Sequence, residues 1–196
     1  MDQKKTSQEE RQRGSDSLSD PWVTFSFSHG DGSGEIAGMT LSGIGYDVHR
    51  FAEGRKLVLG GVEIPFVLGL DGHSDADVLC HAIADALLGA IGEADIGHHF
   101  PNTDPKCAGM SSLEIVRRAA ELVAAQGGRI CNVDSSLIAE APKIAPHLAA
   151  MKENLARVLG LDPRRVGIKA TTNERMGFLG RREGIAAMAV ASVEVP

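Results

Sequence analysis

Residues 41–51 read LSGIGYDVHRF and residues 75–91 read DADVLCHAIADALLGAI, and these two neighbouring stretches decide the fold class. The first favours a β-strand, whereas the second spaces its apolar side chains as one face of a helix does. Ser74, just before the second stretch, is a candidate N-cap for that helix. Between the two, residues 57–66 predict a hairpin that turns at Gly60 and Gly61.

The alternation of strand and helix continues to the end of the chain. Gly127 and Gly128 are typical of a helix end, and no long proline-rich linker interrupts the pattern. The expected elements are helices at 111–126 and 145–159 and strands at 129–138, 165–171 and 184–195. The sequence therefore predicts a single α/β (α+β) domain over residues 41–196.

Residues 1–40 differ from the rest of the chain. They are polar, lack a sustained hydrophobic period, and carry four basic against seven acidic side chains. This composition predicts a disordered N-terminal extension. A secretory signal needs an apolar core and an organelle transit peptide avoids acids, so neither fits. We therefore expect a bacterial cytoplasmic protein rather than a plastid-type one.

The composition argues against several classes of protein. The 196 residues are 43% hydrophobic and 23% charged, with no apolar run long enough to span a membrane. A net charge of -6 and an aromatic content of 4% argue against a nucleic-acid-binding surface. Cys80, Cys107 and Cys131 contain no C-x-x-C, so we expect a reducing compartment and no disulfide framework.

Asp47, His49 and His81 form a candidate metal site. Residues two apart on a strand point to the same side, so the Asp47 carboxylate and the His49 imidazole converge. With His81 from the following helix they offer three ligands and leave a fourth position open, as in catalytic zinc sites. Asp77 or Asp85, each four residues from His81, is the expected partner that orients its imidazole. For each histidine alone, a buried polar group satisfied by hydrogen bonds is the alternative.

Three further motifs indicate anion binding. His73 lies in GHSDAD at 72–77, directly before the expected helix start, where an anion is favoured and simple capping is the alternative. ATTNE at 170–174 offers hydroxyl, amide and carboxylate groups, and GFLGRREG at 177–184 carries two arginines; a structural strand end and a surface turn are the alternatives. No P-loop or nucleophile elbow is present. The residues alone thus indicate a divalent-metal site near anion-binding backbone.

Six motifs occur in order: GIGYDVHRF at 43–51, GHSDADVLCHA at 72–82, DALLGA at 85–90, DIGHHFPNTDP at 95–105, APK at 141–143 and KATTNERMGFLGRREG at 169–184. Together they resemble the family of 2-C-methyl-D-erythritol 2,4-cyclodiphosphate synthases of the non-mevalonate isoprenoid pathway, over residues 43–196. The resemblance implies a lyase that converts 4-diphosphocytidyl-2-C-methyl-D-erythritol 2-phosphate to the cyclic diphosphate and releases CMP. It also implies a mixed β-sheet packed on helices.

The resemblance also implies roles for individual residues. Asp47, His49 and His81 match the ligands of one zinc ion per subunit, and Glu174 matches a ligand of a second divalent cation, Mg²⁺ or Mn²⁺. His73 and Thr172 match catalytic positions that stabilise the transition state. The matches to substrate-binding positions are Ser74, Asp95, Ile96, Gly97, Phe100, Pro101, Asn102, Thr103, Asp104, Ala139, Glu140, Ala141, Pro142, Lys143, Ile144, Ala145, Thr171, Asn173, Phe178 and Arg181. Among these, 95–97 and 100–104 match the methylerythritol loop, and 139–145 match the cytidine-diphosphate pocket.

Two residues depart from the family pattern. Asn102 stands where an aspartate is common, and its amide oxygen can still accept a hydrogen bond. Asn173 stands where a threonine is frequent, which puts the side-chain contact at that position in doubt.

The resemblance implies a homotrimer with each active site between adjacent subunits. Its central cavity, faced by the sheets, is expected to hold an isoprenoid diphosphate. Two other functions stay open: a metal-dependent phosphohydrolase that uses the open metal position for water, and a non-catalytic isoprenoid-diphosphate-binding trimer.

Overall fold

The computed structural model describes residues 38–101, 103 and 109–196. Residues 1–37 of the expected extension therefore lie outside the described part, whereas Met39 and Thr40 already belong to the first strand. Among the described residues, no helix is long and apolar enough to cross a membrane.

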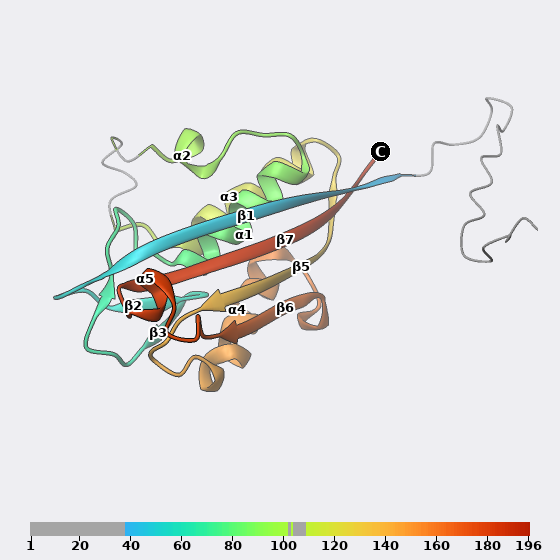
Figure 1. Ribbon diagram of the computed structural model, residues 1–196. Helices are drawn as coiled ribbons and strands as arrows, with labels where there is room; N and C mark the ends of the chain where they lie inside the picture. Colours follow the sequence, from blue (N-terminus) through green and yellow to red (C-terminus); the bar gives the residue numbers. More distant parts are fainter. Residues whose placement is uncertain (1–37, 102, 104–108) are drawn as a thin grey trace, which may run out of the picture. The chain divides into compact units, whose positions relative to one another are not determined.

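A five-stranded mixed sheet forms the centre of the fold (Figure 1). Its strands, in spatial order, are β4 (Gly69–Leu70), β1 (Met39–Ala52), β7 (Gly184–Val195), β5 (Arg129–Ile138) and β6 (Val166–Thr171). The β5–β6 pair is parallel and the other neighbouring pairs are antiparallel. The hairpin of β2 (Leu57–Leu59) and β3 (Val62–Ile64) forms a separate two-stranded sheet, turning at the two predicted glycines. The mixed sheet and the predicted strands are confirmed.

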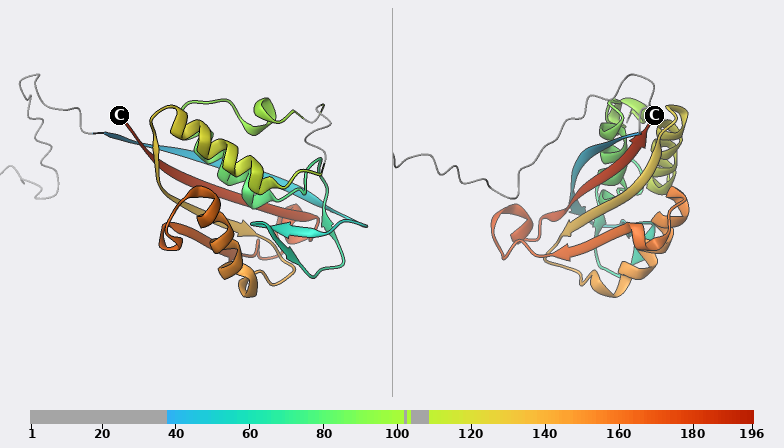
Figure 2. Two further views of the ribbon diagram at one scale, coloured as in Figure 1. Left: turned by 180° about the vertical axis from the view of Figure 1, so that it is seen from behind. Right: turned by 90° about the vertical axis from the view of Figure 1, so that its right-hand side faces the viewer.

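Three long helices cover one face of the sheet, as the two views in Figure 2 make clear. They are α1 (Val78–Ala90), α3 (Ser112–Ala125) and α4 (Leu148–Leu159), the last preceded by the 3-10 turn η2 (Ala145–His147). Buried apolar side chains of these helices and the sheet form the core. Three further single-turn helices carry no periodic signal in the sequence and were not predicted: α2 (Ile96–His99), η3 (Pro163–Arg165) and α5 (Gly177–Gly180).

The start of α1 differs from the prediction. Its N-cap is Asp77 rather than Ser74, and the Asp77 side chain accepts a hydrogen bond from the backbone N–H of Cys80. Helix α1 therefore begins three residues later than expected. His73 precedes a loop and not the helix itself, so the prediction that the helix N-terminus lies directly at His73 is wrong.

The other face of the sheet carries exposed apolar side chains. Ile44, Tyr46 and Val48 of β1 alternate with the residues that face α1, and Met188 and Val190 of β7 are exposed as well. No helix among the described residues covers this face (Figures 1 and 2). A contiguous apolar surface of this kind is typical of an interface.

Two glycines of β1 allow α1 to pack very close to the strand. A Cβ at Gly43 or Gly45 would overlap backbone atoms of α1, at Ala86 and Ala82 respectively. Asp47 and His49 continue the same side of the strand, because side chains alternate with a period of two. Close packing at the glycines therefore brings the next turn of α1, with His81, against these two side chains.

Candidate metal centre and active site

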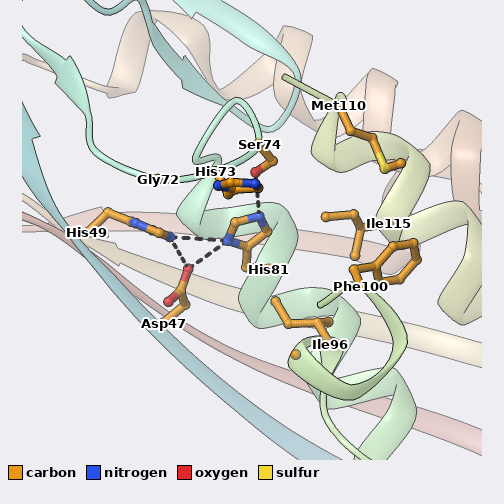
Figure 3. Close-up of a pocket in the computed structure, with 11 residues that line it drawn as sticks. Asp47, His49, Gly72, His73, Ser74, His81, Ile96, Phe100, Met110 and Ile115 are labelled. Carbon is orange, nitrogen blue, oxygen red and sulfur yellow. Dashed lines mark hydrogen bonds and ion pairs between the residues drawn. The ribbon is translucent and has the colours of Figure 1, made fainter. Parts of the chain in front are cut away.

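Asp47, His49 and His81 meet at one point between β1 and α1 (Figure 3). Asp47 Oδ2 lies 2.9 Å from His49 Nε2 and 2.9 Å from His81 Nδ1, and the two imidazole nitrogens are 3.2 Å apart. Neighbouring ligands of a tetrahedral ion with bonds of about 2.0–2.1 Å are separated by about 3.3 Å. The three ligand atoms could therefore hold a divalent metal ion, and their chemistry suits zinc.

The hydrogen bonding of His49 supports this interpretation. Its Nδ1 lies 2.6 Å from the backbone carbonyl oxygen of Asp71. A carbonyl oxygen only accepts, so Nδ1 carries a hydrogen and Nε2 of the neutral ring directs its lone pair toward Asp47. A lone pair and a carboxylate oxygen that face each other repel, and a cation bound between them removes this repulsion.

The electrostatics of the cluster lead to the same conclusion. Burial alone raises the pKa of Asp47, but hydrogen bonds and charge from His49 and His81 hold that pKa well below its usual range. Burial alone lowers the pKa of His49, yet hydrogen bonds and charge from Asp47 and Asp71 together outweigh burial, so the pKa is raised. Asp47 is thus ionised, and its field favours positive charge at the point where the three ligand atoms meet.

A cavity of about 230 Å³ lies beside the three ligands. It includes several predicted site residues: His73, Ser74, Ile96, Gly97 and Phe100. Sequence reasoning missed the other lining residues, which are Gly72, Met110 and Ile115. Met110 and Ile115 are single apolar residues outside the six motifs, so no sequence signal marked them.

Neither of the two aspartate side chains predicted to orient His81 forms a hydrogen bond with its imidazole. Asp77 is fully buried and accepts the backbone N–H of Gly61 at 2.7 Å, which joins the β2–β3 turn to the start of α1. Asp85 accepts the backbone N–H of Ile96 at 2.8 Å. The hydroxyls of Ser112 and Ser74 instead lie 2.9 Å and 3.2 Å from His81 Nε2. The prediction that Asp77 or Asp85 orients His81 is therefore wrong.

The predicted methylerythritol loop begins at one wall of this cavity. Asp95 caps α2 by accepting the backbone N–H of His98 at 3.0 Å. Burial raises the pKa of Asp85, and the N–H of Ile96 opposes that rise. Pro101 and Thr103 are exposed, whereas Asn102 and Asp104 lie outside the described residues.

A second cavity, of about 210 Å³, lies at the ends of β5 and β6. Its lining contains most of the predicted cytidine-diphosphate residues, namely Ala139, Glu140, Pro142, Lys143, Ile144, Ala145, Thr171 and Thr172. Ala141 lies within the same segment, joined to Pro142 by a cis peptide bond. The Glu140 carboxylate accepts the backbone N–H groups of Asn173 and Arg175 at 3.0 Å and 2.9 Å. Glu140 therefore holds the segment after β6 in place.

Thr172 lines this second cavity and contacts Glu174. The Thr172 hydroxyl donates to Glu174 Oε1 at 2.7 Å. The Asn173 amide donates to the Met176 carbonyl oxygen at 2.7 Å, so the residue that departs from the family pattern binds its own loop. Phe178 is 44% exposed on α5, and Arg181 pairs with Glu183 at 2.6 Å.

The two cavities share no lining residue. Asp47 pairs with Ala187, Ala187 with Leu137, and Leu137 with Ala170, so one row of the sheet joins the metal ligands to β6. The two ends of this row are three strand spacings apart, a distance of about 14 Å. The metal half and the predicted cytidine half of the site therefore lie toward opposite edges of the same sheet.

Comparison with known proteins identifies the family. The sequence profile of the YgbB family matches residues 40–194. The chain belongs to the YgbB family. It is similar to the 2-C-methyl-D-erythritol 2,4-cyclodiphosphate synthase of Akkermansia muciniphila, with 65% identity over 159 residues, 81% of this chain and 94% of the relative. The enzyme of the same name from Symbiobacterium thermophilum is 61% identical over 153 residues, which are 78% of this chain and 98% of the relative.

Solved structures of YgbB-type synthases share the fold. A 2-C-methyl-D-erythritol 2,4-cyclodiphosphate synthase in its CDP-bound form is 39% identical, with a TM-score of 0.71, over 76% of this chain and 97% of that one. The resemblance seen in the six motifs is thus confirmed, and the chain is an enzyme of this synthase type.

Proposed function

We propose that this YgbB-family enzyme converts 4-diphosphocytidyl-2-C-methyl-D-erythritol 2-phosphate to 2-C-methyl-D-erythritol 2,4-cyclodiphosphate and CMP. An oxygen of the 2-phosphate attacks the β-phosphorus, and the bond from that phosphorus to the oxygen bridging to the α-phosphate breaks. That oxygen leaves with CMP. The observation that carries the proposal is the Asp47, His49 and His81 cluster at the wall of a cavity, in a chain 65% identical to a relative of that name.

The reacting groups are two phosphates of one molecule, which repel each other. Holding them together and offsetting their charge is the main catalytic demand. We propose that Asp47, His49 and His81 hold a zinc ion, which when bound supplies positive charge to the β-phosphate. The substrate provides its own nucleophile, so the fully buried Cys80 beside His81 serves packing and not chemistry.

We assign the remaining residues by their cavity. His73 and Ser74 line the metal-side cavity, where His73 would stabilise the transition state and Ser74 would contact the substrate. Residues 95–97 and 100–104 would bind the methylerythritol part. At the second cavity Lys143 and its neighbours would bind the cytidine diphosphate, with Thr172 as the other stabilising group. Phe178 and Arg181 would supply further substrate contacts.

A second divalent cation, Mg²⁺ or Mn²⁺, would bind through Glu174. Among the described residues the metal-ligand cluster at Asp47 is the single one found, so Glu174 offers one protein carboxylate. Mg²⁺ is commonly held by one or two carboxylates together with substrate phosphates and water. The diphosphate of the substrate would complete this site.

We propose that the active enzyme is a homotrimer whose subunits join the two half-sites. Two observations support this: the cavities lie toward opposite edges of one sheet, and the uncovered sheet face carries exposed Ile44, Tyr46 and Met188. In a closed ring, the metal half of one subunit can meet the cytidine half of the next. The apolar faces would then surround a central cavity, for which an isoprenoid diphosphate is the proposed ligand.

Incubation with the candidate substrate tests the reaction directly. The full-length protein, loaded with Zn²⁺ and supplied with Mg²⁺, is followed by phosphorus NMR. The expected result is stoichiometric CMP and a cyclic diphosphate. A linear phosphate product would instead indicate a phosphohydrolase, and the absence of turnover with retained isoprenoid-diphosphate binding would indicate a binding protein.

A further inference from the structure

A chain of hydrogen bonds contacts the imidazole of His81 on the side of the ring away from Asp47 and His49. Its Nδ1 faces Asp47, whereas its Nε2, on the opposite side of the ring, lies 2.9 Å from Ser112 Oγ. Ser112 is the first residue of α3 and is 0% exposed. Its hydroxyl makes a very short contact with Asp75 Oδ1, and its backbone N–H donates to Asp75 Oδ2 at 3.0 Å. Ser112 of α3 thus links His81 to Asp75, which lies in the loop before α1.

The chemistry of these groups fixes the direction of the chain. The Asp75 carboxylate only accepts, so the hydroxyl hydrogen of Ser112 is directed to Asp75. Ser112 Oγ is then left with lone pairs toward His81, and His81 Nε2 must carry the hydrogen between them. Nε2–H in the neutral ring leaves the lone pair on Nδ1, the atom that faces Asp47 and His49.

The second hydroxyl near Nε2 is a weaker partner. Ser74 Oγ lies 3.2 Å from His81 Nε2 and already accepts the backbone N–H of Ala76 at 3.1 Å. Ser74 also contacts Ser112 Oγ at 3.3 Å, so it packs beside the chain and has no carboxylate behind it to orient its hydrogen. The link that sets the tautomer of His81 therefore runs through Ser112.

We propose that Asp75 and Ser112 are positioning residues that fix the tautomer and ring orientation of His81 for metal binding. This inference rests on the proposed metal site. Hydrogen bonds from metal-bound histidines to such outer groups commonly change metal affinity by about 10–100-fold. Neither residue lines the cavity beside the metal ligands, so their effect is transmitted through His81.

If Asp75 served only to cap α3, removing the Ser112 hydroxyl would leave zinc binding unchanged. The contact of Asp75 with the Ser112 backbone N–H also satisfies a free donor at the start of α3, where Ser111 makes no side-chain cap. Ser112→Ala keeps this backbone contact and removes only the hydroxyl. Ser111→Ala, at the exposed neighbouring residue, is the matched control.

Metal affinity of the full-length protein, measured by competition with a chromophoric zinc chelator, tests the proposal. Ser112→Ala should bind Zn²⁺ about 10–100-fold more weakly than the wild type, whereas Ser111→Ala should match it. The Co²⁺-substituted Ser112→Ala protein should show a shifted visible absorption spectrum, because the ligand field at Nδ1 changes. Wild-type affinity with an unchanged Co²⁺ spectrum in Ser112→Ala would overturn the proposal.

Asp75→Asn provides a second test should Ser112→Ala fail to fold. If the new amide NH₂ donates to Ser112 Oγ, the hydroxyl hydrogen turns toward His81 and favours the tautomer with the hydrogen on Nδ1. If the amide is flipped, its NH₂ faces the Ser112 backbone N–H, so two donors repel each other. We therefore expect weaker Zn²⁺ binding in either orientation, and wild-type affinity in this variant would overturn the proposal. Failure of the wild-type protein itself to bind Zn²⁺ would refute the metal site, and with it this inference.

Discussion

The α-carbon of Gly45 packs directly against the carbonyl oxygen of Ala82, so closely that a Cβ at position 45 would overlap that oxygen. Gly45 lies two residues before Asp47 on β1, and Ala82 directly follows His81 on α1. The missing side chain thus sets the distance between strand and helix at the point where the metal ligands meet. Gly45 carries no functional group, yet the geometry of the candidate metal site depends on it.

Gly45→Ala should both destabilise the fold and weaken metal binding. Forcing a methyl group into this contact moves α1 away from β1, at a cost of about 1–3 kcal/mol in the free energy of unfolding. Gly89→Ala on α1 is the control, because its new Cβ would meet only ordinary contacts at 3.8 Å or more. Urea unfolding and zinc titration of the two variants measure both effects. Equal zinc affinity in Gly45→Ala and the wild type would contradict this account.

Asp85→Ala should affect substrate binding and leave zinc binding intact. The variant loses the carboxylate that accepts the Ile96 N–H and so holds the loop at 95–97. It keeps all three candidate metal ligands. One lost hydrogen bond of about 0.5–1.5 kcal/mol corresponds to a rise in KM of about 2–10-fold. Asp85→Asn retains an oxygen acceptor and should restore KM. Steady-state kinetics and metal analysis separate the outcomes, and zinc loss in Asp85→Ala would assign Asp85 to the metal site.

Ile44→Lys should prevent trimer formation. Ile44 is 67% exposed on the uncovered sheet face, and a lysine there would bury an unpaired charge in the proposed interface. Val67→Lys is the control, because Val67 is 85% exposed and lies outside the strands. Sedimentation equilibrium should give a monomer for Ile44→Lys and a trimer for Val67→Lys. A trimeric Ile44→Lys protein would place the interface elsewhere.

Mixing two inactive variants should restore activity if each site is shared between subunits. His81→Ala damages the metal half and Lys143→Ala the cytidine half. In a three-membered ring, every mixed trimer contains one interface with both halves intact, so random 1:1 reassembly should give about a quarter of wild-type activity. Turnover is measured on trimers whose mixed composition has been verified by mass spectrometry. Mixed trimers without recovered turnover would mean that each subunit holds a complete site.

The sequence by itself determined the main elements and the three candidate metal ligands. The strand at 129–138 and the end of the helix at 159 agree with the structure, since both follow from local periodicity. The convergence of Asp47 and His49 was predictable for the same reason, because side chains two apart on a strand share a side. The family motifs added the expected substrate and its contacts.

Tertiary structure alone decided the environment of the ligands. Helical spacing pointed to Asp77 and Asp85 as partners of His81, but Asp77 turns back to cap its own helix and Asp85 holds the Ile96 backbone. The groups that do contact His81 Nε2 are the hydroxyls of Ser74 and Ser112, and the nearer of the two, Ser112, is 31 residues away in the sequence. Periodicity describes neighbours within one element, whereas this contact depends on how α3 packs against α1. The separation of the two cavities across the sheet likewise follows from strand order, which only the folded chain specifies.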